Sequence, residues 1–233
     1  MKPLCIYPAG ILVLSLALMA CHLQNRDSVK TNVLFISVDD LNDWVGVLGG
    51  HEGTLTPNID RLASQGTLFT NAYCPAPACN PSRAAMMTGI RPSTSGVYRN
   101  DQPWRNSPVL AHAPTIPQYF RQHGYKVMGS GKIFHGRFPD PASWDYYWPS
   151  QTKNKPDDPM PADRPVNQIP NTGHFDWGPV QVKDTAMGDW RVANWVRGQL
   201  EMEHEKPFFL ACGIFRPHLP WYVPSPYFDR YPS

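Results

Sequence analysis

The 233-residue sequence carries almost no net charge, since 21 Lys and Arg residues stand against 19 Asp and Glu residues. A chain this close to neutrality has no electrostatic footprint for a phosphate backbone, so we expect no nucleic-acid partner. Cysteine is scarce as well, and five cysteines are too few for a disulfide framework in a chain of this length. The 26 prolines and 17 glycines are too few for a collagen-like or low-complexity chain, but they predict long irregular loops.

The sequence also lacks an apolar run long enough to span a membrane, which takes about 20 residues. Its longest run, residues 11–20, follows a short segment with a single positive charge and ends before Cys21. This pattern is typical of a secretory signal peptide, and Leu18–Cys21 resembles a bacterial lipobox. We therefore expect a lipoprotein signal peptide over 1–20 and a tether over 21–31. Export would be to the periplasm or outer membrane, with membrane contact only through a lipid on Cys21.

Strand and helix patterns alternate over the rest of the chain, which predicts an α/β fold: a mostly parallel sheet with helices on both faces. The runs 33–38 and 208–214 are continuously apolar, as in strands buried on both faces. Capping and periodicity signals add further elements. We expect strands at 67–73 and 125–128, helices at 57–65, 81–88, 115–123 and 184–204, and a long substrate-facing loop at 139–179.

Two adjacent carboxylates, Asp39 and Asp40, follow the first predicted strand. The carboxyl ends of parallel strands are where ligands bind in such sheets. Adjacent carboxylates repel one another unless a cation lies between them, and Ca²⁺ or Mg²⁺ would satisfy both. On the dipeptide alone, a solvated acidic turn is the favoured interpretation.

A second pattern places Cys79 at the start of a predicted helix whose first residue would be Pro81. The free N–H groups and the dipole of a helix N-terminus favour an anionic nucleophile there. Arg83, one turn later, can direct its guanidinium to the same anion or to a bound oxyanion. These residues predict an activated nucleophile in an oxyanion site. A buried structural cysteine beside a surface arginine is the alternative that they leave open.

The segment Cys79–Gly89, with the pattern Cys-x-Pro-Ser-Arg at its start, is similar to the signature of the type I sulfatases, which belong to the alkaline phosphatase superfamily and depend on formylglycine. The Asp39–Asp40 pair, the segment 56–63 and the segment 131–135 follow in family order. Residues 91–98 and 216–218 most resemble the iduronate-2-sulfatase-like branch. The resemblance covers 32–233.

This resemblance implies a sulfuric ester hydrolase that acts on sulfated saccharides. A formylglycine-generating maturation enzyme would oxidise Cys79 to Cα-formylglycine. One hydroxyl of its hydrate would attack the sulfur, and the second would expel the bound sulfate as the aldehyde re-forms. Arg83 would steady the hydrate. Ca²⁺, with Mg²⁺ the less favoured ion, would be held by Asp39, Asp40 and the modified Cys79 and would lower the pKa of the nucleophile.

Three further residues gain roles from the resemblance. Lys132 would bind the sulfate, and His135 would hydrogen-bond the hydrate and accept its proton. His218 would contact the sulfate or act as general acid on the leaving oxygen. Without the family order, Lys132 would be a surface lysine, His135 a loop histidine, and His218 a cap within a rigid Pro-x-Pro turn. The remaining histidines match no motif and are interpreted as structural or solvent-exposed: His51, His112, His123, His174 and His204.

The sequence departs from the family pattern after His135. The family carries two more metal ligands in an Asp-Asn-Gly or Asp-His-Gly motif, followed by a second sulfate-binding lysine, and Asp157–Asp158 is a poor substitute. We therefore interpret 32–233 as the N-terminal part of a catalytic domain whose C-terminal portion is missing, with an incomplete site. Two alternatives stay open: a phosphate or phosphonate monoester hydrolase of the same superfamily, and a non-catalytic glycan-binding remnant.

Overall fold

The computed structural model of the protein describes residues 30–231. Its contacts divide the chain into two units, Met1–Thr31 and Asn32–Ser233, of which the second holds the fold described below. The predicted signal peptide over 1–20 and the predicted lipid on Cys21 lie outside the described residues, as does most of the tether. Within the described part, no helix is both long enough and apolar enough to cross a membrane.

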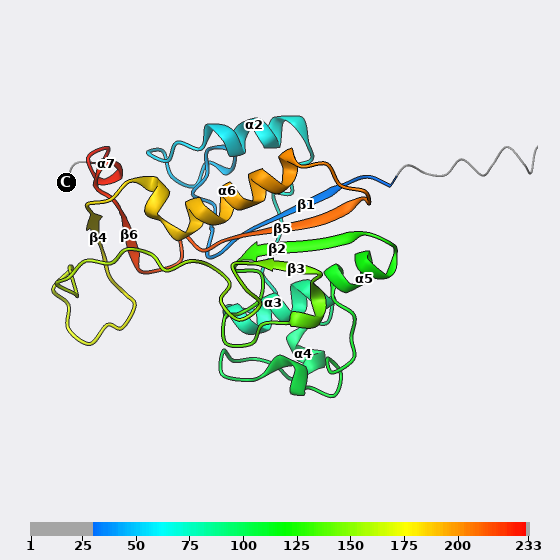
Figure 1. Ribbon diagram of the computed structural model, residues 1–233. Coiled ribbons are helices and arrows are strands. Elements are labelled where there is room, and N and C mark those ends of the chain that lie inside the picture. Colours follow the sequence, from blue (N-terminus) through cyan, green and yellow to red (C-terminus); the bar gives the residue numbers. More distant parts are fainter. Residues whose placement is uncertain (1–29, 232–233) are drawn as a thin grey trace, which may run out of the picture. The chain divides into compact units, whose positions relative to one another are not determined.

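A four-stranded sheet with every strand parallel forms the centre of the second unit (Figure 1). Two strands occupy the same residues as predicted, β1 (Val33–Val38) and β5 (Phe208–Ile214). The strand predicted at 125–128 is β2 (Lys126–Gly131), and β3 (Tyr146–Trp148) is an unpredicted strand inside the proline-rich loop. The strand order is β1-β5-β2-β3.

Helices cover both faces of this sheet, as Figure 1 shows, which confirms the predicted fold class. One face packs against α6 (Gly188–Glu201), and the opposite face carries α3 (Cys79–Thr88) and α5 (Ile116–Gln122). A capping box at Thr115 begins α5, and Gly89 ends α3 in the left-handed conformation. The other helices are α2 (Pro57–Gln65), α4 (Pro92–Ser95), α7 (Ser225–Phe228) and the 3₁₀ turns Gly46–Leu48, Trp104–Asn106, Pro141–Ser143 and Asp184–Ala186.

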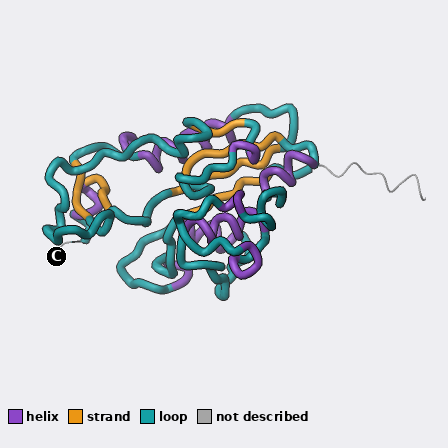
Figure 2. Tube along the Cα trace, turned by 90° about the horizontal axis from the view of Figure 1, so that it is seen from below, coloured by secondary structure: helices purple, strands orange, loops and turns teal. Residues whose placement is uncertain are grey.

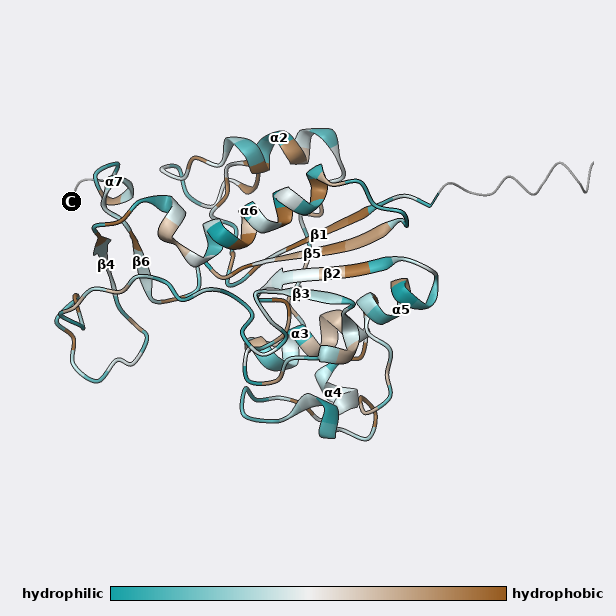
Figure 3. Cartoon of the chain, in the orientation of Figure 1, coloured by the Kyte–Doolittle hydropathy of each residue, from teal (hydrophilic) through white to brown (hydrophobic). Residues whose placement is uncertain are grey.

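The alternation of side chains along β2 and β5 divides the apolar core into two layers. Val127 and Phe209 face α3 and α5, while Met128 and Leu210 face α6, where they meet Val196. Because both faces of β5 are covered, its continuous apolar run is buried as predicted. Figure 3 shows the brown, hydrophobic colouring concentrated in the strands.

The prediction that 33–38 is buried on both faces is wrong for β1. Leu34 and Ile36 are 42% and 52% exposed, because α6 packs against β5 and β2 and leaves β1 at the edge of the sheet. The helix α2 likewise leaves its apolar Leu62 exposed. The strand predicted at 67–73 is also wrong: this segment is an exposed, irregular loop with bends at Thr70 and Asn71, and no described strand pairs with it.

Two helix predictions need smaller corrections. The helix expected over 184–204 begins only at Gly188, and its inward face is Val192 and Val196, while Trp190 of the predicted face is exposed. The helix expected at 81–88 begins at Cys79, so Cys79 itself is the first helical residue.

A second, two-stranded parallel sheet lies apart from the first and joins β4 (Trp177–Val180) to β6 (Trp221–Pro224) (Figure 2). Neither strand is predicted from the sequence, because both are short and rich in proline and tryptophan. Most of the residues between β3 and β4 form irregular loop, in agreement with the predicted excursion.

Two glycines allow β2 and β5 to approach where β2 ends. Gly131 has a φ of +82°, and a Cβ placed on it would lie 1.9 Å from the carbonyl oxygen of Gly213. The amide of Lys132 donates to that same oxygen over 2.8 Å. The left-handed turn, which only glycine adopts without cost, therefore redirects the chain so that Lys132 follows the strand end directly.

We predict that Gly131→Ala lowers the free energy of unfolding by roughly 2–5 kcal/mol, from the left-handed φ and the overpacking together. Gly198→Ala in α6 is the matched control, since a Cβ there meets nothing within 4 Å. In the Gly198→Ala control, the free energy of unfolding is expected to rise by about 1 kcal/mol, because alanine has the higher helix propensity. Urea denaturation of both variants measures the difference, and equal stability of the two would refute this role of Gly131.

Candidate active site

The carboxyl ends of the three longest strands lie at one edge of the sheet, where the residues that follow β1 and β5 line an open cavity and Lys132, after β2, contacts Asp39 and Cys79. Asp39 follows β1, Lys132 follows β2 and His218 lies four residues after β5. Cys79 reaches the same place from the first turn of α3. The cavity has a volume of about 1060 Å³ and is open to solvent, and its walls include Asp39, Asp40, Cys79, Arg83 and His218. All the site residues predicted from the sequence therefore belong to this edge of the sheet.

Asp39 is the buried centre of this arrangement, with only 6% of its surface exposed. Arg83 donates to one carboxylate oxygen over 2.6 Å, and the ammonium group of Lys132 pairs with the other. Burial alone would raise the pKa of Asp39, but the two cations outweigh it and hold that pKa below its usual value. The Asp39–Asp40 pair is therefore no solvated acidic turn, because its first member forms a buried ion-pair triad.

Arg83 also fastens the triad to the backbone. Its guanidinium donates to the carbonyl oxygens of Lys132 and Ile133, the latter over 3.0 Å. With 5% of its surface exposed, it is not the surface arginine of the alternative interpretation. One side chain thus joins α3 to the ends of β1 and β2, and it fixes the distance between Cys79 and the carboxylates.

Cys79 lies beside two groups that stabilise its thiolate. A hydrogen bond with His135 lowers the pKa of the thiol, as does the charge of Lys132, whose Nζ lies 3.6 Å from Sγ. Burial and the carboxylates of Asp39 and Asp40 act in the opposite direction without cancelling the effect. Cys79 is therefore poised as a nucleophile or as a substrate for oxidation.

Asn80, which the sequence analysis did not single out, holds the start of α3 in place. Its backbone amide donates to Asn100, and its side-chain amide donates to the carbonyl oxygens of Arg99 and Gln102. The side chain is buried. These bonds replace the capping side chain that Ala78 cannot provide, so the first turn and Cys79 are positioned from a loop that follows in the chain.

His218 approaches the site from the loop after β5. Its Nε2 lies 3.8 Å from a carboxylate oxygen of Asp40, and its Nδ1 contacts the carbonyl oxygen of Leu219. Asp39, Cys79 and His218 each offer a ligand atom within 4.8 Å of the others. This group could hold a divalent cation, with Asp40 at its exposed side.

The segment before His218 carries a cluster that the sequence analysis missed. Asp158 accepts from Lys155 over 2.8 Å and from Arg216 over 3.1 Å, and it also accepts from the first amide of α6. Lys155 and Lys132 both lie over the ring of Phe215. Asp158 is therefore a structural anchor for the loop that bears His218, which agrees with its rejection as a metal motif.

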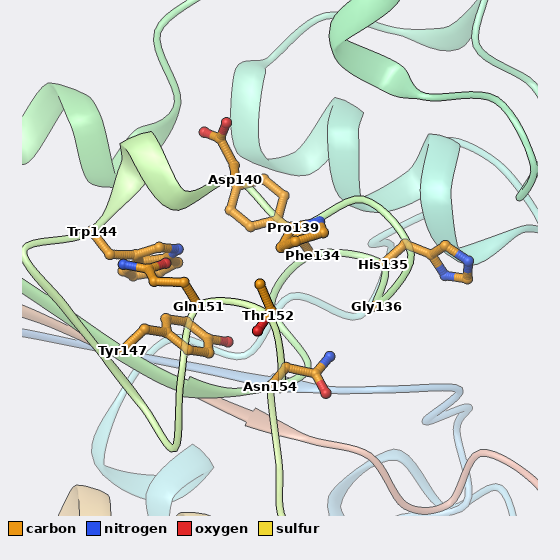
Figure 4. A pocket seen from close by; sticks show the side chains of 10 residues that line it. All are labelled: Phe134, His135, Gly136, Pro139, Asp140, Trp144, Tyr147, Gln151, Thr152 and Asn154. Carbon is orange, nitrogen blue, oxygen red and sulfur yellow. The ribbon is translucent and has the colours of Figure 1, made fainter.

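A small cavity lies behind the loop that carries His135 (Figure 4). Its volume of about 20 Å³ is enough for a single water molecule. In Figure 4 the ring of His135 points away from the other lining side chains. This cavity is thus too small for a substrate.

The fold and this edge define a class: parallel α/β proteins that present a nucleophile and buried cations at the carboxyl ends of their strands. The chain belongs to the sulfatase family, because the family's sequence model, described as "Sulfatase", matches residues 31–233. The resemblance stated from the motifs is therefore confirmed.

Individual relatives agree. A protein named sulfatase from Formosa agariphila is 38% identical, over 95% of this chain and 46% of its own length. Human iduronate 2-sulfatase is 33% identical, over 95% of this chain and 42% of its own. A solved structure described as a 2-O GAG sulfatase superposes with a TM-score of 0.59 at 25% identity, covering 81% of this chain and 35% of that one. The chain spans less than half the length of these relatives.

We predict that Asp39→Asn lowers the free energy of unfolding by about 3–5 kcal/mol, because it leaves two buried cations without their counter-ion. Asp40→Asn is the control: Asp40 is exposed and has a φ of +55°, which Asn adopts readily, so less than about 0.5 kcal/mol is expected. The pKa of Asp39 is lower in the folded state than in the unfolded state. Its contribution to the free energy of unfolding is therefore fully present above the unfolded-state pKa and is lost as the pH falls through the folded-state pKa. Urea titrations at neutral and acidic pH measure both effects, and equal losses for the two variants would contradict the buried triad.

We further predict that Cys79 is alkylated at a lower pH than an ordinary thiol and that His135→Ala moves this profile to higher pH, since the main stabilising hydrogen bond is lost. The measurement is the rate of iodoacetamide labelling against pH, with chelator present and with Cys5, Cys21 and Cys74 each replaced by serine, because Cys74 is exposed and Cys5 and Cys21 lie outside the described residues. Burial raises the pKa of Cys212 to about 11, which keeps that thiol silent. His112→Ala, at an exposed histidine, should leave the profile unchanged. An unshifted profile in His135→Ala would disprove the pairing.

Proposed function

We propose that this chain forms the nucleophile-bearing part of a hydrolase of sulfate esters on sulfated saccharides. The observation that carries the proposal is the contact of Cys79 with Lys132 and His135, beside the triad of Asp39, Arg83 and Lys132. Family membership and relatives named iduronate 2-sulfatase and 2-O GAG sulfatase support it. The cationic groups suit the tetrahedral, negatively charged sulfate of a sulfate ester, and the open cavity admits a group as large as a sugar.

The nucleophile of this proposal is Cα-formylglycine made from Cys79 by a maturation enzyme. When present, its hydrate supplies an oxygen nucleophile and a second hydroxyl that allows the sulfate to leave. The residues of this chain would orient the hydrate and accept its proton. Lys132 would hold a sulfate oxygen, His135 would accept a proton from the position now occupied by Sγ, and Arg83 would fix the first turn of α3.

A divalent cation fits the carboxylate side of the site. Asp39 lies within 4.8 Å of ligand atoms from Cys79 and His218, and Asp40 is exposed beside His218. A calcium ion takes six to eight oxygens, so Asp39, Asp40 and the oxygen at position 79 would be joined by water or substrate oxygens. When bound, the ion would supply charge neutralisation of the sulfate. The carboxylate oxygens of Asp39 would then contact both the ion and Lys132. Mg²⁺ is the less favoured ion for this site.

His218 would serve the leaving group. It lines the cavity beside Asp40, and the contact of its Nδ1 with Leu219 leaves Nε2 directed toward Asp40. A histidine in this place can donate a proton to the departing alcohol oxygen. Export through the segment 1–20, with a lipid on Cys21, is part of the same proposal and would place the enzyme where extracellular polysaccharides arrive.

The test is hydrolysis by the chain after co-expression with a formylglycine-generating enzyme, with conversion of Cys79 measured by peptide mass spectrometry. We expect faster turnover of an aryl sulfate than of the matching aryl phosphate. Lys132→Met should reduce the rate by about 10²–10³-fold, the usual cost of one oxyanion-stabilising group. Lys126→Met, on the exposed end of the same strand, is the control and should change little.

Three outcomes would contradict the proposal. An unmodified thiol at Cys79 would remove the nucleophile. A preference for the phosphate ester would favour the phosphate or phosphonate hydrolase alternative. Converted protein that hydrolyses neither ester would favour a glycan-binding role for this chain.

A further inference from the structure

A second cavity, separate from the one that holds Cys79, lies between the proline-rich loop and the start of β6. Its volume is about 390 Å³, within the range of small-molecule sites. Arg164, Asn171 and His174 contribute polar groups, and Pro220 and Tyr222 contribute apolar surface. The sequence analysis left His174 as structural or solvent-exposed, and no residue of this cavity is used in the proposed chemistry.

Two histidine rings form the boundary between the cavities. His218 lines the cavity of Cys79, and His174 lines the second one. Their ring centroids are 5.7 Å apart. A ligand whose reactive sulfate lies beside Lys132 would therefore extend past these rings into the second cavity.

The second cavity has one arginine, Arg164, and one carboxylate, Asp176, among its described lining residues, and only the arginine is free to bind a ligand. Its only carboxylate among the described lining residues is Asp176, and both of its oxygens are engaged. They accept from the backbone amides of Val166, Asn167 and Trp177 over 2.9–3.0 Å and from the hydroxyl of Tyr222. Asp176 is buried and holds the loop in place, and because both of its oxygens already accept hydrogen bonds it offers none to a ligand.

Arg164 is the free cation of this cavity. Its guanidinium makes a 2.9 Å contact with the thioether of Met160, and it forms no ion pair with any residue that the structure describes. A thioether is a weak acceptor, so most of the five donors stay open to a ligand. Guanidinium groups bind carboxylates and sulfates through paired hydrogen bonds.

Exposed aromatic residues flank the segments that form this cavity, although they are not among its lining residues. Phe175 packs edge-on against Trp177 at 5.5 Å, and Trp177 is paired with Trp221 in the two-stranded sheet. All three rings are at least 37% exposed. Flat exposed rings next to polar donors are suited to amphipathic ligands such as sugars.

We infer that the second cavity binds the sugar next to the one that carries the reactive sulfate, and that Arg164 selects a sugar with an anionic group, either a carboxylate or a second sulfate. This inference rests on the proposed function and deepens it, because it names the substrate as an acidic oligosaccharide. His174 acts as a positioning residue that keeps the two sites in line through its contact with His218.

The experiment measures binding by calorimetry to the full chain carrying Cys79→Ala, which prevents turnover. Three disaccharide probes share one sulfated sugar and differ in the neighbouring sugar, which is a uronic acid, a second sulfated sugar or a neutral sugar. We expect Arg164→Gln to weaken binding of one or both anionic probes by at least about 10-fold and to leave the neutral probe unchanged. The probe that loses more identifies carboxylate or sulfate as the recognised group.

Arg191→Gln is the matched control, since Arg191 is an exposed arginine on α6 away from either cavity. His174→Ala should weaken all three probes, while His204→Ala should weaken none. Three results would overturn the inference. Arg164→Gln could lower the affinity for neutral and anionic probes equally, it could leave the affinity for both anionic probes unchanged, or the chain could bind none of the probes. Hydrolysis of an aryl sulfate, which has no second sugar, tests the proposed function independently, so the two failures are distinguishable.

Discussion

The structure depends on the buried ion-pair triad in which Asp39 lies between Arg83 and Lys132. Each member comes from a different element: the end of β1, the first turns of α3 and the end of β2. A buried charge without an oppositely charged partner is costly. The ion pairs of Asp39 with Arg83 and Lys132 therefore fix the positions of these three elements relative to one another. Cys79 takes its environment from this constraint, because Lys132 contacts both Asp39 and Sγ.

The same constraint explains the use of glycine at the strand ends. Lys132 follows β2 with its charge in the interior, which is possible because Gly131 turns and Gly213 leaves room. The loop after β5 needs a second anchor, and Asp158 supplies it by pairing with Arg216 and Lys155. The site thus rests on two charge clusters, a buried one around Asp39 and a half-buried one around Asp158. The proline-rich loop connects the second cluster to the neighbouring cavity.

Much of the fold could be predicted because local patterns agreed with it. The runs 33–38 and 208–214 became β1 and β5, and the caps at Thr115 and Gly89 bounded their helices. The failures share one cause. Leu34 and Ile36 would be buried only if another element covered that face of β1, and 67–73 would form a strand only beside a neighbouring strand. Local sequence does not encode either neighbour, and neither is present among the described residues. β4 and β6 were missed for the opposite reason: they form by pairing with one another across 40 residues of chain.

The sequence by itself indicated which groups could do chemistry, since Cys79, Arg83 and the Asp39–Asp40 pair stand out by residue type and position, while Lys132 was singled out only through the family resemblance. It also indicated the positions of β1, β2 and β5 and of the helices α2, α3, α5 and α6, which follow from apolar runs, periodicity and capping. Only the tertiary structure decided which charges neutralise one another, that Cys79 is the first residue of its helix, and that His174 adjoins His218. Those relations join residues far apart in the chain, and they arise from strand order and buried charge pairing, which no local pattern of side chains can specify.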